Sequence, residues 1–238
     1  QLILKNIINQ TCFAASTQES RPILTGVNFK IEKSSLECIA TDSYRLSKKT
    51  INLNNNDNNL NIVIPGKNLL ELLKILPEED GNIEIHILSN SVLIKTDEML
   101  FQSRLLNGSY PDTSKLIPEN FELTLTLKLT EIYNAIDRVS LLTSEKDKNL
   151  IKMEIMEDEI ILSSTSQEIG KIEERIKLEN KIKTEMKIAY SSKYMLEALR
   201  SLKCENIEIK LNGEIKPIII KSVEDNNLIQ LVLPIKTF

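Results

Sequence analysis

The sequence predicts an α+β fold that is built twice, in two domains whose segments recur at a shift of about 125 residues. The matching pairs are Asn82–Ile85 with Asn206–Ile209, Leu69–Leu76 with Met195–Leu202, and Leu2–Asn9 with Leu127–Asn134. A period of this length is typical of duplicated domains, because solenoid repeats are far shorter. The 238 residues are enough for each copy to bury its own hydrophobic core.

Each half reads as a helix, strands, a second helix and further strands. In the first half the spacing of apolar residues predicts a helix over 3–16, strands over 27–31 and 36–40, a helix over 66–76, and strands over 84–87, 92–95 and 101–106. Pro77 ends the second helix, since proline cannot continue it. The Asn-rich stretch 54–61 is predicted to be a polar loop.

Turn-forming residues over 107–120 mark the junction, and the predicted domains are 1–118 and 119–238. The second half repeats the order, with helices over 129–143 and 191–203, strands over 150–156, 159–165 and 169–178, and further strands up to the C-terminus. The expected architecture is two helices per domain set against antiparallel sheet.

Composition and charge exclude several classes of protein. The net charge of −4, spread over both halves, argues against a tight DNA-binding protein, which normally carries a basic excess. No apolar run is long enough to span a membrane, and no signal peptide opens the chain, so we expect a cytoplasmic protein. The chain starts without Met and reads as a fragment or a processed form. Cys12, Cys38 and Cys204 are expected to be reduced thiols.

Enzyme motifs are absent from the sequence. It has no Gly-rich phosphate loop, no G-x-S-x-G elbow, and no Cys or His pairs at metal-ligand spacing. The single histidine, His86, lies in a predicted strand and has no motif that would make it a general base. We therefore expect no catalytic residue, no metal and no cofactor.

The second helix of each half carries a repeated charged stripe. Lys67, Glu71 and Lys74 share one helix face, and the corresponding stripe consists of Lys193, Glu197, Arg200 and Lys203. An ordinary solvated face accounts for either stripe alone. The recurrence of basic residues in the same places gives equal weight to a shared partner that meets both helices.

Seven segments resemble a known family. They are RPILTGVNF (Arg21–Phe29), ATDSYRL (Ala40–Leu46), IPGKNLLELLKIL (Ile64–Leu76), SYPDTSKLIP (Ser109–Pro118), TSEK (Thr143–Lys146), LKCENI (Leu202–Ile207) and LVLPIKTF (Leu231–Phe238). Taken alone, the Thr-Asp-Ser of the second segment reads as a plain turn. Together and in this order, the seven resemble the second and third domains of the beta sliding clamp family of bacterial DNA polymerase III.

The resemblance implies a DNA polymerase processivity factor. Family members have three similar domains per chain, and two chains close into a ring around duplex DNA. This chain looks like a clamp without its first domain, so we expect no closed homodimer. By the resemblance Gln18 and Lys67 face DNA, and the stripe argument adds Lys74, Lys193, Arg200 and Lys203.

The resemblance also implies a pocket, where the two domains meet, for short motifs of the DNA polymerase III alpha subunit, the clamp loader and repair polymerases. Its apolar wall would be Leu24, Thr41, Leu46, Pro111, Leu116, Leu231, Leu233, Pro234 and Ile235, and its polar rim Tyr44, Arg45, Lys115 and Lys236. An apolar trough with a few polar groups suits Leu and Phe anchors of an extended peptide. Two departures, Tyr44 in place of a frequent His and the ending Thr237-Phe238, leave partner preference open.

Leu141 and Leu142 match the apolar tip that contacts the neighbouring subunit in relatives, and we expect that tip to be exposed in this chain. Two other functions stay open. One is a structural two-domain scaffold without a ligand groove, and the other is a hydrolase or transferase that uses the acidic clusters.

Overall fold

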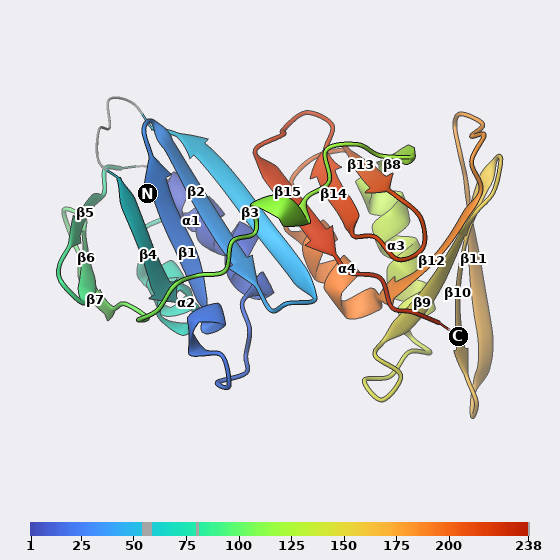
Figure 1. Ribbon diagram of the computed structural model, residues 1–238, viewed down its shortest axis with the longest axis horizontal. Coiled ribbons are helices and arrows are strands. Elements are labelled where there is room, and N and C mark those ends of the chain that lie inside the picture. The colour runs from blue at the N-terminus through green and yellow to red at the C-terminus, as the bar shows by residue number, and fades with distance from the viewer. Residues whose placement is uncertain (54–58, 80, 238) are drawn as a thin grey trace. The chain divides into compact units, whose positions relative to one another are not determined.

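The computed structural model describes residues 1–53, 59–79 and 81–237 (Figure 1). The chain divides into two compact units, Gln1–Asp112 and Thr113–Phe238. The division falls inside the predicted junction, ahead of the predicted boundary at Pro118. Most of the predicted polar loop 54–61 lies outside the described residues.

The first unit contains two helices and seven strands in its described residues. The helices are α1 (Leu2–Thr11) and α2 (Gly66–Ile75); the strands are β1 (Gly26–Glu32), β2 (Ser35–Thr41), β3 (Arg45–Asn52), β4 (Leu60–Pro65), β5 (Glu84–Ile87), β6 (Ser91–Lys95) and β7 (Leu100–Arg104). They form two antiparallel sheets, in the orders β4-β1-β2-β3 and β5-β6-β7. Helix α1 packs on β2 and β3, and α2 packs on β1 and β4.

The second unit repeats this plan and adds one strand at its start. The helices are α3 (Leu129–Ser140) and α4 (Ser192–Arg200); the strands are β8 (Leu123–Lys128), β9 (Leu150–Ile155), β10 (Glu159–Ser166), β11 (Gly170–Lys177), β12 (Met186–Ser191), β13 (Asn206–Leu211), β14 (Ile218–Ser222) and β15 (Leu228–Val232). Its two antiparallel sheets have the orders β11-β10-β9-β12 and β15-β14-β13-β8. The predicted α+β architecture is confirmed.

Burial defines how the two copies correspond. Leu4, Ile7 and Ile8 of α1 are buried in the same pattern as Ile132, Ala135 and Ile136 of α3. Both triplets pack into the apolar core of their own unit. The predicted match of Leu2–Asn9 with Leu127–Asn134 is therefore wrong by three residues, because it puts Leu127, a strand residue, in a helix.

Four strands, β3, β4, β8 and β12, were not predicted from the sequence. Strand β8 alternates buried and exposed residues, but it runs directly into α3 without a turn. Strand β12 likewise runs straight into α4. Strand β3 carries mostly polar residues, so it lacks an apolar pattern. The predicted helix over 3–16 is shorter, since α1 ends at Thr11 and a 3₁₀ turn over Cys12–Ala14 follows.

The described helices include none that is long and apolar enough to cross a bilayer. The three thiols are free, with Cys12 and Cys38 buried and Cys204 partly exposed. Burial raises the pKa of Cys12 from 9.0 to about 12 and raises the pKa of Cys38 well above its ordinary value. Both buried thiols therefore stay neutral and slow to react at neutral pH.

We expect iodoacetamide at about pH 8 to modify Cys204 in the folded chain, and Cys12 and Cys38 only after unfolding, as mass spectrometry of tryptic peptides would report.

The raised pKa of Cys12 also makes stability depend on pH. Above about pH 9 the unfolded thiol loses its proton while the folded one keeps it, so the free energy of unfolding falls as pH rises toward about 12. Cys12→Ala should reduce this slope, and an unchanged slope in both Cys12→Ala and Cys38→Ala would contradict the assignment.

Candidate functional site

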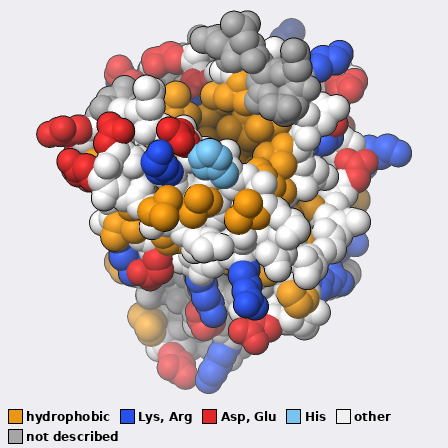
Figure 2. All heavy atoms as spheres, turned by 90° about the vertical axis from the view of Figure 1, so that its left-hand side faces the viewer, with side chains coloured by type: hydrophobic (Ala, Val, Ile, Leu, Met, Phe, Trp, Pro, Cys, Tyr) orange, Lys and Arg blue, Asp and Glu red, His pale blue; other side chains and the backbone are white. Residues whose placement is uncertain are grey.

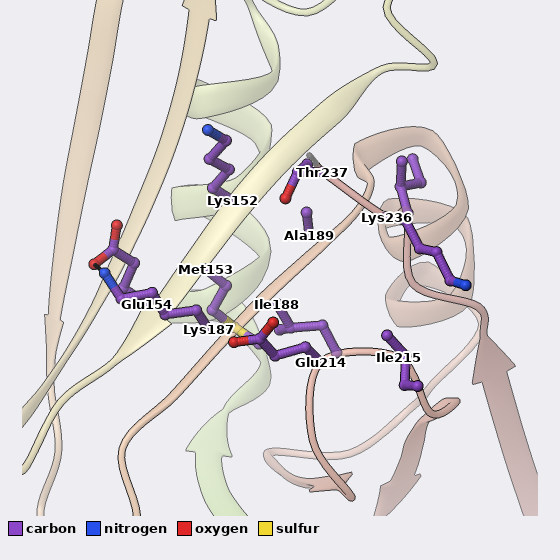
Figure 3. Close-up of a pocket in the computed structure, with 11 residues that line it drawn as sticks. Lys152, Met153, Glu154, Lys187, Ile188, Ala189, Glu214, Ile215, Lys236 and Thr237 are labelled. Atoms are coloured by element: carbon purple, nitrogen blue, oxygen red, sulfur yellow. Dashed lines mark ion pairs between the residues drawn. The ribbon is translucent and has the colours of Figure 1, made fainter.

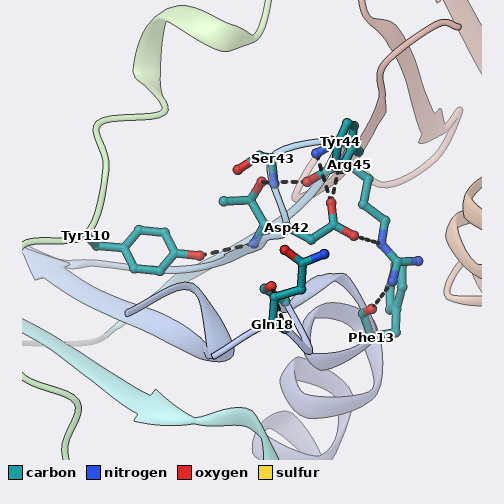
Figure 4. Close-up of polar contacts among 9 residues, drawn as sticks. Phe13, Gln18, Asp42, Ser43, Tyr44, Arg45 and Tyr110 are labelled. Carbon is teal, nitrogen blue, oxygen red and sulfur yellow. Dashed lines mark hydrogen bonds and ion pairs between the residues drawn. The ribbon is translucent and has the colours of Figure 1, made fainter. Parts of the chain in front are cut away.

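The turn between β2 and β3 is held by one aspartate (Figure 4). Asp42 Oδ1 accepts hydrogen bonds from the backbone N–H of Tyr44 at 2.9 Å and of Arg45 at 3.0 Å. Ser43, between Asp42 and Tyr44, has a φ of 78°, a left-handed conformation that non-glycine residues adopt rarely. The carboxylate takes the place of backbone partners in the turn, as Asx turns do.

Arg45 was predicted at a polar rim, but its side chain is buried and braces the same turn. Its Nε donates to Asp42 Oδ2 at 3.0 Å, and a terminal nitrogen donates to the carbonyl of Phe13 at 2.6 Å. The guanidinium also lies 5.4 Å from the centre of the Phe13 ring. Since Phe13 belongs to the 3₁₀ turn after α1, Arg45 links the helix end to the β2–β3 turn.

The turn projects Tyr44, whose side chain is 61% exposed. A second brace lies at the other end of the turn, where the N–H of Thr41 donates to the Tyr110 hydroxyl at 3.1 Å. Burial raises the pKa of Tyr110 far above its ordinary value, so the hydroxyl stays neutral. Pro111, the next residue along the chain, is exposed. Of the other predicted residues in this unit, Leu24 and Leu46 are buried.

In the second unit the predicted residues fall on two segments. Leu231 is buried in β15, while Leu233, Pro234 and Ile235 follow the strand as a partly exposed tail and Lys236 is exposed. The N–H of Ile235 donates to the carbonyl of Ala189 in β12 at 2.7 Å. Pro234 has no N–H, so Ile235 supplies the main-chain bond that positions this part of the tail.

Lys115 and Leu116 lie on the other segment, a 3₁₀ helix over Ser114–Leu116 near the start of the second unit. Both side chains are exposed. The structure thus gives the position of each predicted pocket residue within the unit to which it belongs.

A groove of about 460 Å³ runs beside the tail (Figure 3). Strands β9 and β12, the loop after β13 and the tail provide its lining, which is Lys152, Met153, Glu154, Lys187, Ile188, Ala189, Glu214, Ile215, Ile235, Lys236 and Thr237. Lys187 and Glu154 form an ion pair of 2.7 Å across neighbouring strands. The groove is lined by apolar side chains and by charged side chains of both signs. Of its lining residues, only Ile235 and Lys236 were predicted as part of the pocket.

The predicted DNA-facing residues are all exposed. Lys74 pairs with Glu71 at 2.7 Å, and Lys193 lies 3.6 Å from Glu145. Arg200 donates to the Tyr133 hydroxyl at 2.8 Å and lies over its ring. These contacts leave the cationic ends of both stripes at the surface, with Lys67 exposed on α2, Lys203 exposed after α4, and Gln18 exposed on the loop after α1.

The predicted subunit-contact tip lies where α3 ends. Leu141 is 75% exposed and Leu142 is partly buried. The exposure of Leu141 is as expected, and the contact itself stays a prediction.

Comparison with known proteins identifies the family. The model of the central domain of the DNA polymerase III beta subunit matches residues 1–112, and that of its C-terminal domain matches residues 114–236. The chain belongs to the DNA polymerase III beta-subunit family. The two matched domains of the beta subunit coincide closely with the two units of the structure.

Relatives and solved structures agree with this assignment. The chain is 45% identical over 236 residues to a beta sliding clamp of Staphylococcus aureus and 44% identical to one of Staphylococcus epidermidis. It superimposes with a TM-score of 0.95 on a DNA polymerase sliding clamp of Bacillus subtilis, at 44% identity, and on a DNA polymerase III beta chain of Streptococcus pneumoniae, at 34%. Each alignment covers 99% of this chain and 63% of the relative.

Sequence reasoning missed the residues that support the turn in this beta-subunit chain. Asp42 was predicted only as a turn former, and no role was predicted for Phe13 or Tyr110. The position of Asp42 two residues before Tyr44 signals the Asx turn. No sequence pattern signals the carbonyl of Phe13 or the hydroxyl of Tyr110, because both reach the turn through tertiary packing.

We expect Arg45→Met to lower the free energy of unfolding by about 3 kcal/mol, because it leaves the carboxylate of Asp42, only 12% exposed, without its cation. Lys74→Met breaks the exposed pair with Glu71 and serves as control, with an expected loss under about 1 kcal/mol. Urea unfolding followed by circular dichroism measures both. Equal losses in the two variants would show that Arg45 does not brace the turn.

Proposed function

We propose that the chain is the central and C-terminal part of a sliding clamp, a non-catalytic processivity factor that encircles duplex DNA and tethers replication proteins. The observation that most strongly supports this proposal is the match of both beta-subunit domains, in order, over nearly all of the chain. The chain spans about 63% of the length of its curated relatives, which are named beta sliding clamps. The ring itself is therefore proposed for the longer protein.

We propose further that short linear motifs of the polymerase alpha subunit, the clamp loader and repair polymerases bind to the β2–β3 turn and to the C-terminal tail. Three features support this role. Tyr44 is an exposed aromatic side chain on a turn that is braced from both ends, so little conformational entropy is lost when it binds a peptide. Leu233 and Ile235 offer partly exposed apolar side chains on a tail held by a main-chain bond. Lys236 adds a polar group beside them.

The exposed cations of α2 and α4 would meet the DNA backbone. The net charge of −4 means that such contacts are few and weak, which suits a protein that slides. Closure of the ring would keep the protein on DNA even though its binding to the DNA backbone is weak. We propose that Leu141 contributes to the contact between the two chains of that ring, and that the protein acts in the cytoplasm.

The two alternatives lack an observation of their own. His86 is exposed and its Nε2 lies 3.1 Å from Glu84, so this contact joins the imidazole to a carboxylate and not to a nucleophile. For a scaffold without a groove, the structure offers no observation in its favour, whereas a groove lines the C-terminal tail.

The proposal predicts that a short fluorescein-labelled peptide with spaced Leu and Phe residues binds this chain saturably, as fluorescence anisotropy would report. Because anchor contacts dominate such interfaces, Tyr44→Ala and Ile235→Ala should each weaken binding about tenfold or more. Leu141→Ala and Lys193→Ala alter exposed residues outside the proposed site and should leave binding unchanged. Absence of saturable binding at millimolar peptide would leave the scaffold as the function of these two domains.

A further inference from the structure

The tripeptide Leu-Asn-Gly occurs twice in the chain, once in each unit. The two copies are Leu106-Asn107-Gly108 and Leu211-Asn212-Gly213, and no other glycine of the sequence follows an asparagine. Both glycines have a positive φ, of 121° and 88°, which glycine adopts without strain because it lacks Cβ. The same missing Cβ leaves the backbone nitrogen of each glycine open to approach by the side chain of the preceding asparagine.

The first copy lies in a loop that is anchored on both sides but not in its middle. It follows β7, in the sheet whose face gathers hydrophobic side chains around the single histidine (Figure 2). The N–H of Leu106 donates to the carbonyl of Val63 at 2.9 Å, and the next anchor is the bond from Thr41 to the Tyr110 hydroxyl. Residues 107–109 between these anchors are exposed, and within the described part of the chain none of the three makes a hydrogen bond.

The second copy is held by the side chain of its asparagine. Asn212 Oδ1 accepts a hydrogen bond from the N–H of Glu122 at 2.8 Å, and Asn212 Nδ2 donates to the carbonyl of Asn120 at 2.6 Å. The residue is also partly buried, whereas Asn107 is exposed. Both bonds must break before the amide of Asn212 can turn toward its own backbone.

We propose that Asn107 is a site of spontaneous deamidation and that the fold protects Asn212 from the same reaction. The backbone nitrogen of Gly108 loses its proton to solvent and bonds to Cγ of Asn107, while the Cγ–Nδ2 bond breaks and Nδ2 takes up a proton and leaves as ammonia. Water then adds its hydroxyl to one carbonyl carbon of the cyclic imide and its proton to the nitrogen. Opening at Cγ gives aspartate, and opening at the backbone carbonyl gives isoaspartate. Water is the only other reactant, and the reaction depends on these local groups and not on the proposed function.

Isoaspartate at this position alters the backbone close to the β2–β3 turn. In isoaspartate the main chain runs through Cβ and Cγ of residue 107, which adds one backbone atom three residues before Tyr110. The hydroxyl of Tyr110 braces the turn through the N–H of Thr41 (Figure 4). The longer backbone therefore changes the path by which the chain reaches this brace.

Peptide mapping compares the two sites within one chain. The folded protein is incubated in mildly alkaline buffer, and mass spectrometry follows the acidic product in the tryptic peptides 105–115 and 211–221, with an unincubated sample as the baseline. We expect Asn107 to convert at least about tenfold faster than Asn212, since two hydrogen bonds hold the Asn212 amide. In urea the two rates should become similar, because the shared Leu-Asn-Gly sequence then determines both.

The variant Asn107→Gln changes an exposed residue and should abolish the product in peptide 105–115, because the longer side chain closes a larger ring slowly. Three results would each overturn the proposal: equal conversion of both asparagines in the folded chain, faster conversion of Asn212, or an Asn107 that converts in urea but stays intact in the folded chain.

Hydrogen exchange followed by NMR measures the effect on the turn. In the isoaspartyl form the Thr41 amide should exchange at least about tenfold faster than in the parent chain, as it should in Tyr110→Phe, which removes the accepting hydroxyl. Asn107→Asp carries the same charge on an unaltered backbone and should leave exchange of the Thr41 amide unchanged. Unchanged exchange in the isoaspartyl form, or equally fast exchange in Asn107→Asp, would overturn the link between the backbone change and the turn.

Discussion

The packing of two helices against antiparallel sheet determines the rest of each unit. In the first unit, burial of Leu4, Ile7 and Ile8 fixes α1 on β2 and β3. That packing brings the carbonyl of Phe13, just beyond the helix, against the guanidinium of Arg45. The guanidinium in turn holds Asp42, which shapes the turn that presents Tyr44. The exposure of one aromatic ring thus traces back, through one buried cation, to the apolar face of a helix.

Much of this architecture can be predicted from the sequence. The repeat, the alternation along strands and the charged stripes of α2 and α4 all rest on local periodicity, which burial of one face imposes. Strands β8 and β12 were missed because each runs into a helix without a turn residue to separate them. The wrong register at Leu2–Asn9 has the same origin, since similar spacing of leucines occurs in a helix and in a strand.

The candidate site could be predicted from the sequence only in part. Sequence similarity to clamp proteins pointed to the β2–β3 turn and the tail as candidate segments, and Tyr44 and Lys236 on them are exposed. It placed Arg45 at a rim, where the structure has a buried brace. The reason is physical: an arginine and an aspartate three residues apart look the same in a sequence whether solvent or a phenylalanine lies beside them. Long-range contacts decide between the two, and they have no local signature.

The single bond between Ile235 and Ala189 has a practical consequence for anyone who handles this protein. The last residues run beside a groove lined by lysines and glutamates, and a main-chain hydrogen bond holds them to the rim of β12. A bulky label attached at Lys236 or Thr237 would therefore lie in the lining of that groove. Labels are better attached at the hairpin of β10 and β11, where Ile169 is 72% exposed and is not part of the groove lining.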